Sequence, residues 1–79
     1  MTVRLREAFG WYGVAAILLA YALVSFGLLD GESVGYQMLN LTGASGLVLV
    51  SFVRRAYQPV VLNVVWGGIA FVAILNAVF

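Results

Sequence analysis

The chain has 79 residues, of which 65% are hydrophobic and only 9% are charged, and its net charge is +1. A water-soluble chain of this length buries a marginal core and needs a charged surface, so this composition excludes an ordinary soluble domain. The low net charge also argues against nucleic-acid binding, which needs a basic patch. We therefore expect one membrane domain that spans residues 1–79.

The residue inventory limits the chemistry that the chain can perform. It contains no cysteine, histidine or lysine, so disulfides, thiolate metal sites and the usual general bases and nucleophiles are absent. Three acidic residues, four tyrosines and the hydroxyl side chains remain. We therefore predict a protein that is not an enzyme, with no catalytic residue, no cofactor and no metal site.

The first membrane span is predicted at Phe9–Leu29, after a polar segment, Met1–Ala8, that we expect to form a tail or an interfacial turn. Trp11 and Tyr12 begin the span, where an aromatic belt is expected. Small residues recur at helical spacing and would let another backbone approach closely. This first stripe comprises Gly10, Gly13, Ile17, Ala20, Val24 and Gly27.

Tyr21 lies near the middle of this span. Because its hydroxyl group is costly in hydrocarbon, we expect it to face protein or water. It then either bonds to a neighbouring helix or lines a site. The triplet Ala20-Tyr21-Ala22 resembles a signal-peptide cleavage site, but the apolar run continues past it, which favours a retained span.

A turn at Asp30–Gly35 separates the first span from the second. Gly31 supplies turn geometry, and Ser33 is a candidate cap for the next helix. Asp30 and Glu32 could bind a cation, but two acids without a third ligand favour a solvated turn.

The second span is predicted at Tyr36–Val53, and its first half is unusually polar. Its polar residues are Gln37, Asn40, Thr42 and Ser45. Such a helix is costly to expose to lipid, so we expect it to be the most protein-enclosed of the three. Asn40 and Thr42 either join helices by hydrogen bonds or form the wall of a polar pocket.

The third span is predicted at Pro59–Phe79, which carries no charge. Arg54 and Arg55 precede it and must lie outside the hydrocarbon core, and Pro59 suits the first turn of a helix. A second stripe suggests close packing against other helices. It comprises Asn63, Trp66, Ala70, Ala73 and Ala77.

Charge distribution predicts the orientation of the three spans. Arg4 and Arg6 precede the first span, and Arg54 and Arg55 follow the second, so an odd number of spans places all four on one side. The positive-inside rule then predicts a cytoplasmic N-terminus and an external C-terminus. The predicted fold is an all-α integral membrane three-helix bundle, multi-pass in a bacterial inner (plasma) membrane.

The segment RRAYQPVVLNVVWGGIAFVAIL, residues 54–75, carries a resemblance to known families. With its paired Leu-Asn motifs, the chain resembles a family of small uncharacterised three-helix bacterial membrane proteins, and is distantly similar to SemiSWEET half-transporters. That similarity implies a homodimer with a central site for a small neutral solute, where Asn63 matches a site asparagine. The tryptophan of that family's second helix falls near Val48, and its Pro-Gln motif near Gly27 and Leu28, so both are missing here.

Two functions follow from these observations. The first is passage of a small neutral solute through a homo-oligomer, expected to be a dimer, because three helices cannot enclose a path. Its substrate-binding residues would be Asn63, Trp66, Asn40, Thr42 and Tyr21. The alternative is a non-enzymatic accessory or assembly subunit of a larger membrane complex, in which the small-residue stripes bind other membrane subunits.

Overall fold

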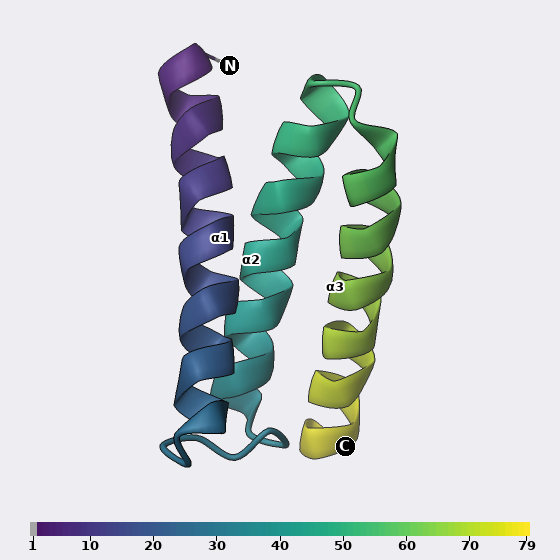
Figure 1. Ribbon diagram of the computed structural model, residues 1–79. Coiled ribbons are helices and arrows are strands. Elements are labelled where there is room, and N and C mark those ends of the chain that lie inside the picture. Colours follow the sequence, from purple (N-terminus) through teal and green to yellow (C-terminus); the bar gives the residue numbers. More distant parts are fainter. Residues whose placement is uncertain (1) are drawn as a thin grey trace.

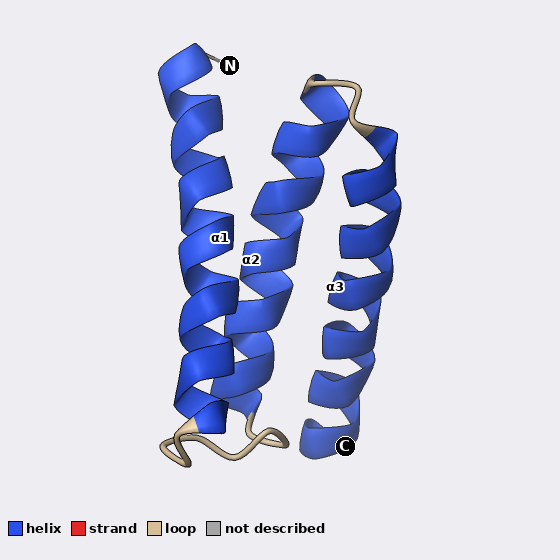
Figure 2. Ribbon diagram, viewed as in Figure 1, coloured by secondary structure: helices blue, strands red, loops and turns tan. Residues whose placement is uncertain are grey.

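The computed structural model describes residues 2–79 and contains three antiparallel helices (Figures 1 and 2). They are α1 (Val3–Ser25), α2 (Val34–Val53) and α3 (Tyr57–Val78). Each is long and apolar enough to cross a membrane. The predicted all-α architecture of three helices is therefore confirmed.

The helices stand in a row, with α2 between the other two (Figure 1). Within the described residues, α1 and α3 make no close backbone approach to each other. Helix α2 also has more buried residues than either neighbour, as its small and polar first half predicts. Its buried residues are Asn40, Gly43, Ala44, Gly46 and Val50.

Glycines bring the backbones of α1 and α2 into direct contact. A Cβ atom built on Gly13 would lie 2.7 Å from the carbonyl oxygen of Gly43, and one on Gly43 would lie 3.1 Å from the carbonyl oxygen of Gly13. One on Gly46 would lie 2.7 Å from the carbonyl oxygen of Phe9. A side chain at Gly13 or Gly46 would force the helices apart, and one at Gly43 would press on Ile17 and Ala16, so the first stripe mediates a close helix contact, as predicted.

The N-terminal boundary of α1 differs from the prediction. Residues Met1–Ala8 were expected to form a polar tail or turn, but the helix begins at Val3, and Met1 lies outside the described residues. Thr2 provides the cap, because its hydroxyl oxygen accepts a hydrogen bond from the Leu5 N–H at 3.1 Å. Hydropathy marks where a chain leaves the hydrocarbon core, whereas a helix can continue into the headgroup region.

The C-terminal boundary of α1 also differs, because the helix ends at Ser25 and not at Leu29. Gly27 adopts a positive φ of 75°, and the N–H of Leu28 donates to the carbonyl oxygen of Leu23 at 2.8 Å. This is a Schellman motif, a common way to terminate a helix. Gly27 thus belongs to the turn and not to the stripe on which its spacing placed it.

The other helix ends agree more closely with the sequence. Ser33 caps α2, since its hydroxyl oxygen accepts a hydrogen bond from the Tyr36 N–H at 3.1 Å. Pro59 lies in the first turn of α3, which begins two residues earlier at Tyr57. Both local predictions are confirmed, and both follow from the hydrogen-bonding capacity of one residue.

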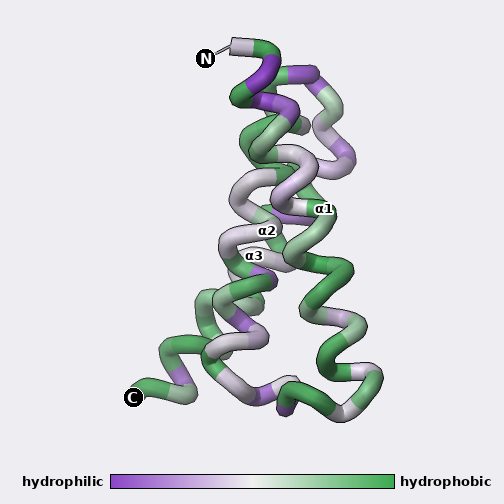
Figure 3. The backbone as a smooth tube through the Cα atoms, turned by 90° about the vertical axis from the view of Figure 1, so that its left-hand side faces the viewer, coloured by the Kyte–Doolittle hydropathy of each residue, from purple (hydrophilic) through white to green (hydrophobic). Residues whose placement is uncertain are grey.

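Large apolar side chains point outward along all three helices, whereas the interior consists mainly of small residues. Trp11 is 70% exposed and Ile69 is 65% exposed, while Ala20 and Ala44 are almost fully buried. Such a surface suits lipid and not water. In Figure 3 hydrophilic colour gathers near the N-terminus and the adjacent α2–α3 connection, which carries Arg54.

Candidate functional site

Asn40 and Trp66 form the central polar contact between α2 and α3. The indole Nε1–H of Trp66 donates to the Oδ1 atom of Asn40 at 3.4 Å, which is a long hydrogen bond. Asn40 is 4% exposed, while Trp66 is 44% exposed because only part of its ring enters the interface. The sequence named both residues as candidates, and the structure brings them together.

Asn63 is also buried between α2 and α3, at 8% exposure. Its Nδ2 group donates to the carbonyl oxygen of Pro59, one turn earlier in the same helix, at 2.9 Å. No described residue donates a hydrogen bond to its Oδ1 atom, which therefore has acceptor capacity to spare. An amide with spare capacity within an apolar span is costly unless a partner, water or a ligand meets it.

Asn63 opens onto a groove of about 360 Å³ beside the α2–α3 interface. The groove is lined by Leu41, Ser45, Val48, Asn63, Val64, Gly67, Gly68 and Phe71. The hydroxyl of Ser45 donates to the carbonyl oxygen of Leu41 at 2.8 Å, so it is already satisfied within its helix. The groove is thus mainly apolar, with one amide oxygen as its free polar feature.

Asn40 faces a different, smaller pocket of about 220 Å³ on the same interface. Tyr36, Gln37, Asn40, Trp66, Ile69 and Ala70 line it, and none of them lines the groove at Asn63. The two asparagines therefore do not converge on one cavity within a single chain. Trp66 lies three residues, about 4.5 Å along the helix axis, from Asn63.

Thr42 faces α1 and takes part in a separate hydrogen-bond pair. Its Oγ1 atom lies 2.6 Å from the hydroxyl oxygen of Tyr12 and 2.8 Å from the carbonyl oxygen of Met38. A consistent assignment has Thr42 donating to the carbonyl while Tyr12 donates to Thr42. The sequence had assigned Tyr12 only to an aromatic belt, so its role as the partner of Thr42 was missed.

Tyr21 lies on the outer side of α1 and is 69% exposed. No hydrogen bond joins its hydroxyl group to another described residue. Within the described chain Tyr21 therefore does not face a neighbouring helix, and the predicted alternatives, water or another protein, stay predictions. The physical reason is helical geometry: Tyr21 follows Tyr12 by nine residues, about two and a half turns, which places the two rings on opposite faces.

The second stripe is only partly confirmed as an interface. Asn63 and Ala70 are buried and Ala73 is half-buried, but Ala77 is exposed. Gly67, which the stripe omitted, is buried, and a Cβ atom on it would lie 3.4 Å from the Cβ atom of Ala44. The contact face of α3 is therefore centred on Asn63, Gly67 and Ala70, at spacings of four and three.

Charged residues lie at both ends of the bundle, where the helices begin and end. At one end Glu7 of α1 forms an ion pair with Arg54, which caps α2. At the other end the Oδ1 atom of Asp30 accepts a hydrogen bond from the N–H of Glu32 at 2.9 Å and so shapes the α1–α2 turn. Asp30 thus has a local structural role, which agrees with the solvated turn that the sequence favoured over a cation site.

Comparison with known proteins adds one relationship. No curated protein and no solved structure matches the chain, and no link to SemiSWEET half-transporters is shown. A family model does match, over residues 6–79, which includes all of α2 and α3 and most of α1. The chain therefore belongs to a family of small uncharacterised proteins.

Proposed function

We propose that the protein is a non-enzymatic membrane subunit that acts by binding transmembrane helices of other proteins through the outer face of α3. The observation that carries this proposal is the contrast between the two glycines of α3. Gly67 packs against Ala44, whereas nothing lies within 4 Å of a Cβ atom built on Gly68. A glycine facing open space in an apolar helix leaves a smooth surface onto which another helix can pack.

The hydrogen bonds within the spans support this function over solute binding. Thr42 and Trp66 use their polar atoms, and Asn40 uses its Oδ1 atom, to join α2 to its neighbours, and Tyr21 faces away from all of them. Side chains engaged in this way fix the geometry of helices and leave little capacity for a solute. Among the described residues, Asn63 keeps a free Oδ1 atom and Asn40 a free Nδ2 group, and the groove at Asn63 also contains Gly68.

The proposed setting is a bacterial inner membrane with the arginine end in the cytoplasm. Arg4, Arg6, Arg54 and Arg55 lie at the end that holds the N-terminus, while Asp30 and Glu32 lie at the opposite end. This separation supports an orientation with the N-terminus inside and Phe79 outside. Fusing a reporter active only on one side of the membrane to each terminus tests the orientation, and an external N-terminus would contradict it.

The variant Gly68→Leu tests the proposed binding face. Because the site faces open space, leucine leaves the three helices intact but blocks the approach of a partner helix. We expect the protein, isolated in mild detergent from its native membrane, to carry another protein in fixed stoichiometry, and Gly68→Leu to lose it. Ile69→Leu on the neighbouring exposed position is the matched control. A wild-type protein that stays monomeric, after chemical cross-linking of the native membrane as well, contradicts the proposal.

A second candidate is passage of a small neutral solute through a homodimer, which one observation favours. Asn63, whose Oδ1 atom accepts no hydrogen bond from a described residue, lines the groove of about 360 Å³, where a second copy could complete a binding site. A defined homodimer without other proteins, together with solute flux in liposomes that Asn63→Leu abolishes, would favour this candidate. Unchanged flux in Asn63→Leu would reject Asn63 as its site.

A further inference from the structure

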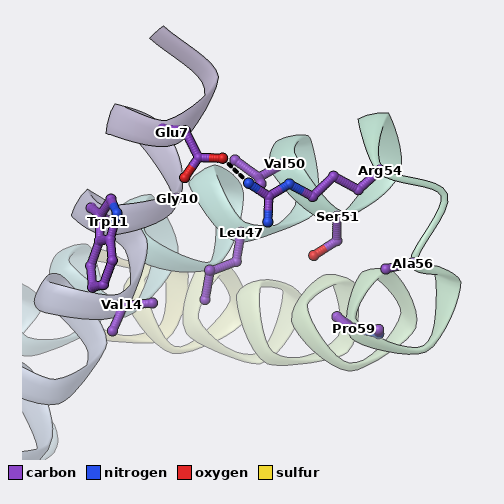
Figure 4. Close-up of a pocket in the computed structure, with 10 residues that line it drawn as sticks. All are labelled: Glu7, Gly10, Trp11, Val14, Leu47, Val50, Ser51, Arg54, Ala56 and Pro59. Atoms are coloured by element: carbon purple, nitrogen blue, oxygen red, sulfur yellow. Dashed lines mark ion pairs between the residues drawn. The ribbon is translucent and has the colours of Figure 1, made fainter. Parts of the chain in front are cut away.

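A separate pocket lies at the arginine end of the molecule, away from both asparagines (Figure 4). Its volume is about 360 Å³, and α1, α2 and the start of α3 all contribute to it. It is lined by Glu7, Gly10, Trp11, Val14, Leu47, Val50, Ser51, Arg54, Ala56 and Pro59. Since α1 and α3 do not approach each other within the described residues, the pocket occupies the space between them, over α2.

The polar side chains of the lining all lie at one end of the pocket. Glu7, Ser51 and Arg54 lie toward the end of the molecule, whereas Val14 and Leu47 lie deeper. From Glu7 to Val14 the axis of α1 advances by about 10 Å. A polar end and an apolar end separated by this distance match the headgroup and the upper acyl chain of one phospholipid.

The charged pair at the polar end identifies the kind of headgroup. Glu7 and Arg54 are paired with each other, but their side chains remain 41% and 51% exposed, so both can exchange partners. The lining therefore offers one carboxylate and one guanidinium group, which together are neutral. A zwitterionic headgroup with one phosphate and one primary ammonium group complements both charges, and guanidinium groups bind phosphate through charge-assisted hydrogen bonds.

Other common headgroups fit this pair less well. The quaternary ammonium group of phosphatidylcholine has no N–H to donate to the Glu7 carboxylate. Phosphatidylglycerol carries no cation, so its phosphate would take the guanidinium group of Arg54 and leave the Glu7 carboxylate without a partner. We propose that this pocket binds phosphatidylethanolamine, with its phosphate on Arg54, its ammonium group on Glu7 and an acyl chain along Trp11, Val14 and Leu47. The proposal depends on the helices being in a membrane, but not on which proposed function is correct.

Trp11 gives a direct readout, because the chain has only two tryptophans and Trp66 can be replaced by phenylalanine. In Trp66→Phe protein, brominated acyl chains quench the fluorescence of Trp11 on contact. Vesicles of unbrominated phosphatidylcholine would contain a small fraction of brominated phosphatidylethanolamine, phosphatidylcholine or phosphatidylglycerol. We expect phosphatidylethanolamine to bind about fivefold more tightly than the other two, the upper part of the range for an ion pair that is partly exposed.

Glu7→Gln should reduce this preference to near unity, while Arg54→Gln should weaken quenching by all three lipids. Arg4→Gln is the matched control, because Arg4 lies at the same end but does not line the pocket. The preference is a ratio measured within one variant, so a general loss of structure does not imitate the result for Glu7→Gln. Val14→Phe, which fills the apolar part, should lower quenching by every lipid.

Three outcomes would overturn the proposal. Equal quenching by the three lipids would exclude a specific site. Strongest quenching by phosphatidylglycerol, unchanged in Glu7→Gln, would indicate general attraction to the arginines. An unchanged preference for phosphatidylethanolamine in Glu7→Gln would show that the carboxylate does not recognise the ammonium group.

Discussion

The two helix interfaces of this protein are built from different chemistry. Between α1 and α2, Gly13 and Gly43 place backbone against backbone, and the contact has no room for a side chain at Gly13 and little at Gly43. Between α2 and α3, Asn40 and Asn63 are buried next to open pockets, and Asn63 retains an acceptor without a donor. The first interface is fixed by shape, whereas the second keeps the capacity to bind something else.

The largest effect is expected from enlarging Gly13, which disrupts the α1–α2 interface. Gly13→Leu would push side-chain atoms into the carbonyl oxygen of Gly43 and the side chain of Leu47. We expect it to lower the free energy of unfolding by about 3 kcal/mol, the upper part of the range for overpacking. Unfolding of the purified protein in increasing denaturing detergent, followed by circular dichroism, measures the change.

Gly68→Leu is the control for this substitution. The same side chain is added, but nothing lies within 4 Å of its Cβ atom, so the unfolding free energy of the isolated protein should change by less than about 0.5 kcal/mol. Equal losses for the two variants would mean that leucine is unfavourable at any glycine here. The contact between α1 and α2 would then not be fixed by shape.

The polar contact between α2 and α3 is tested by a double-mutant cycle. Asn40→Ala and Trp66→Phe each remove one partner of the 3.4 Å hydrogen bond. We expect a coupling energy of about 0.6 kcal/mol, the average for such bonds within a membrane, and less than about 1.7 kcal/mol. The same detergent unfolding measures the four proteins. A coupling energy near zero would mean that Asn40 is buried for its shape and not for its hydrogen bond.

The corresponding bond between α1 and α2 should matter less. Tyr12→Phe removes the donor to Thr42, but the Thr42 hydroxyl keeps its bond to the Met38 carbonyl oxygen at 2.8 Å, so no buried group is left unsatisfied. The expected loss is about 0.5 kcal/mol. Tyr21→Phe is the matched control, because that hydroxyl has no partner among the described residues, and it should have no effect. If Tyr12→Phe lowered the free energy of unfolding more than Asn40→Ala does, the polar contact would matter more between α1 and α2 than between α2 and α3.

The sequence predicts the helices better than their pairing. The spans follow from apolar composition, and the central position of α2 follows from its many small and polar residues. The rotation of each helix does not follow, because α1, α2 and α3 all carry small residues that could meet any neighbour. Gly13 and Gly67 therefore share a chemistry but pack against different faces of α2.

Tyr12 and Tyr21 show what the sequence could and could not predict about the buried side of α1. Both lie in α1, but their separation of nine residues places them on opposite sides, so at most one could face α2. Gly13, Ala16 and Ala20 identify the side that is buried, and Tyr21 lies outside it. The partner of Tyr12 could not be predicted, because Thr42 is 30 residues away in the chain. Whether Thr42 faces α1 depends on the rotation of α2, which the Gly13–Gly43 contact sets.

The turns that follow α1 and α2 offer a last comparison, with a small expected effect. Both helices end in a residue with positive φ, Gly27 at 75° after α1 and Arg55 at 59° after α2. In both turns the next N–H returns to the helix: Leu28 donates to Leu23 at 2.8 Å, and Ala56 donates to the Ser51 carbonyl oxygen at 2.9 Å. The backbone motif is the same, but only one turn uses glycine, which adopts this conformation without steric cost.

Arg55→Gly should therefore stabilise the protein. A left-handed conformation costs a residue with a Cβ atom about 1–2 kcal/mol, and the entropy that glycine loses on folding offsets part of this gain. We expect a net increase of about 0.5 kcal/mol in the free energy of unfolding, measured in the same detergent titration. Gly27→Ala provides the reverse comparison and should destabilise the α1 turn. If Arg55→Gly destabilised the protein instead, the interactions of the guanidinium group would contribute more than its backbone conformation costs.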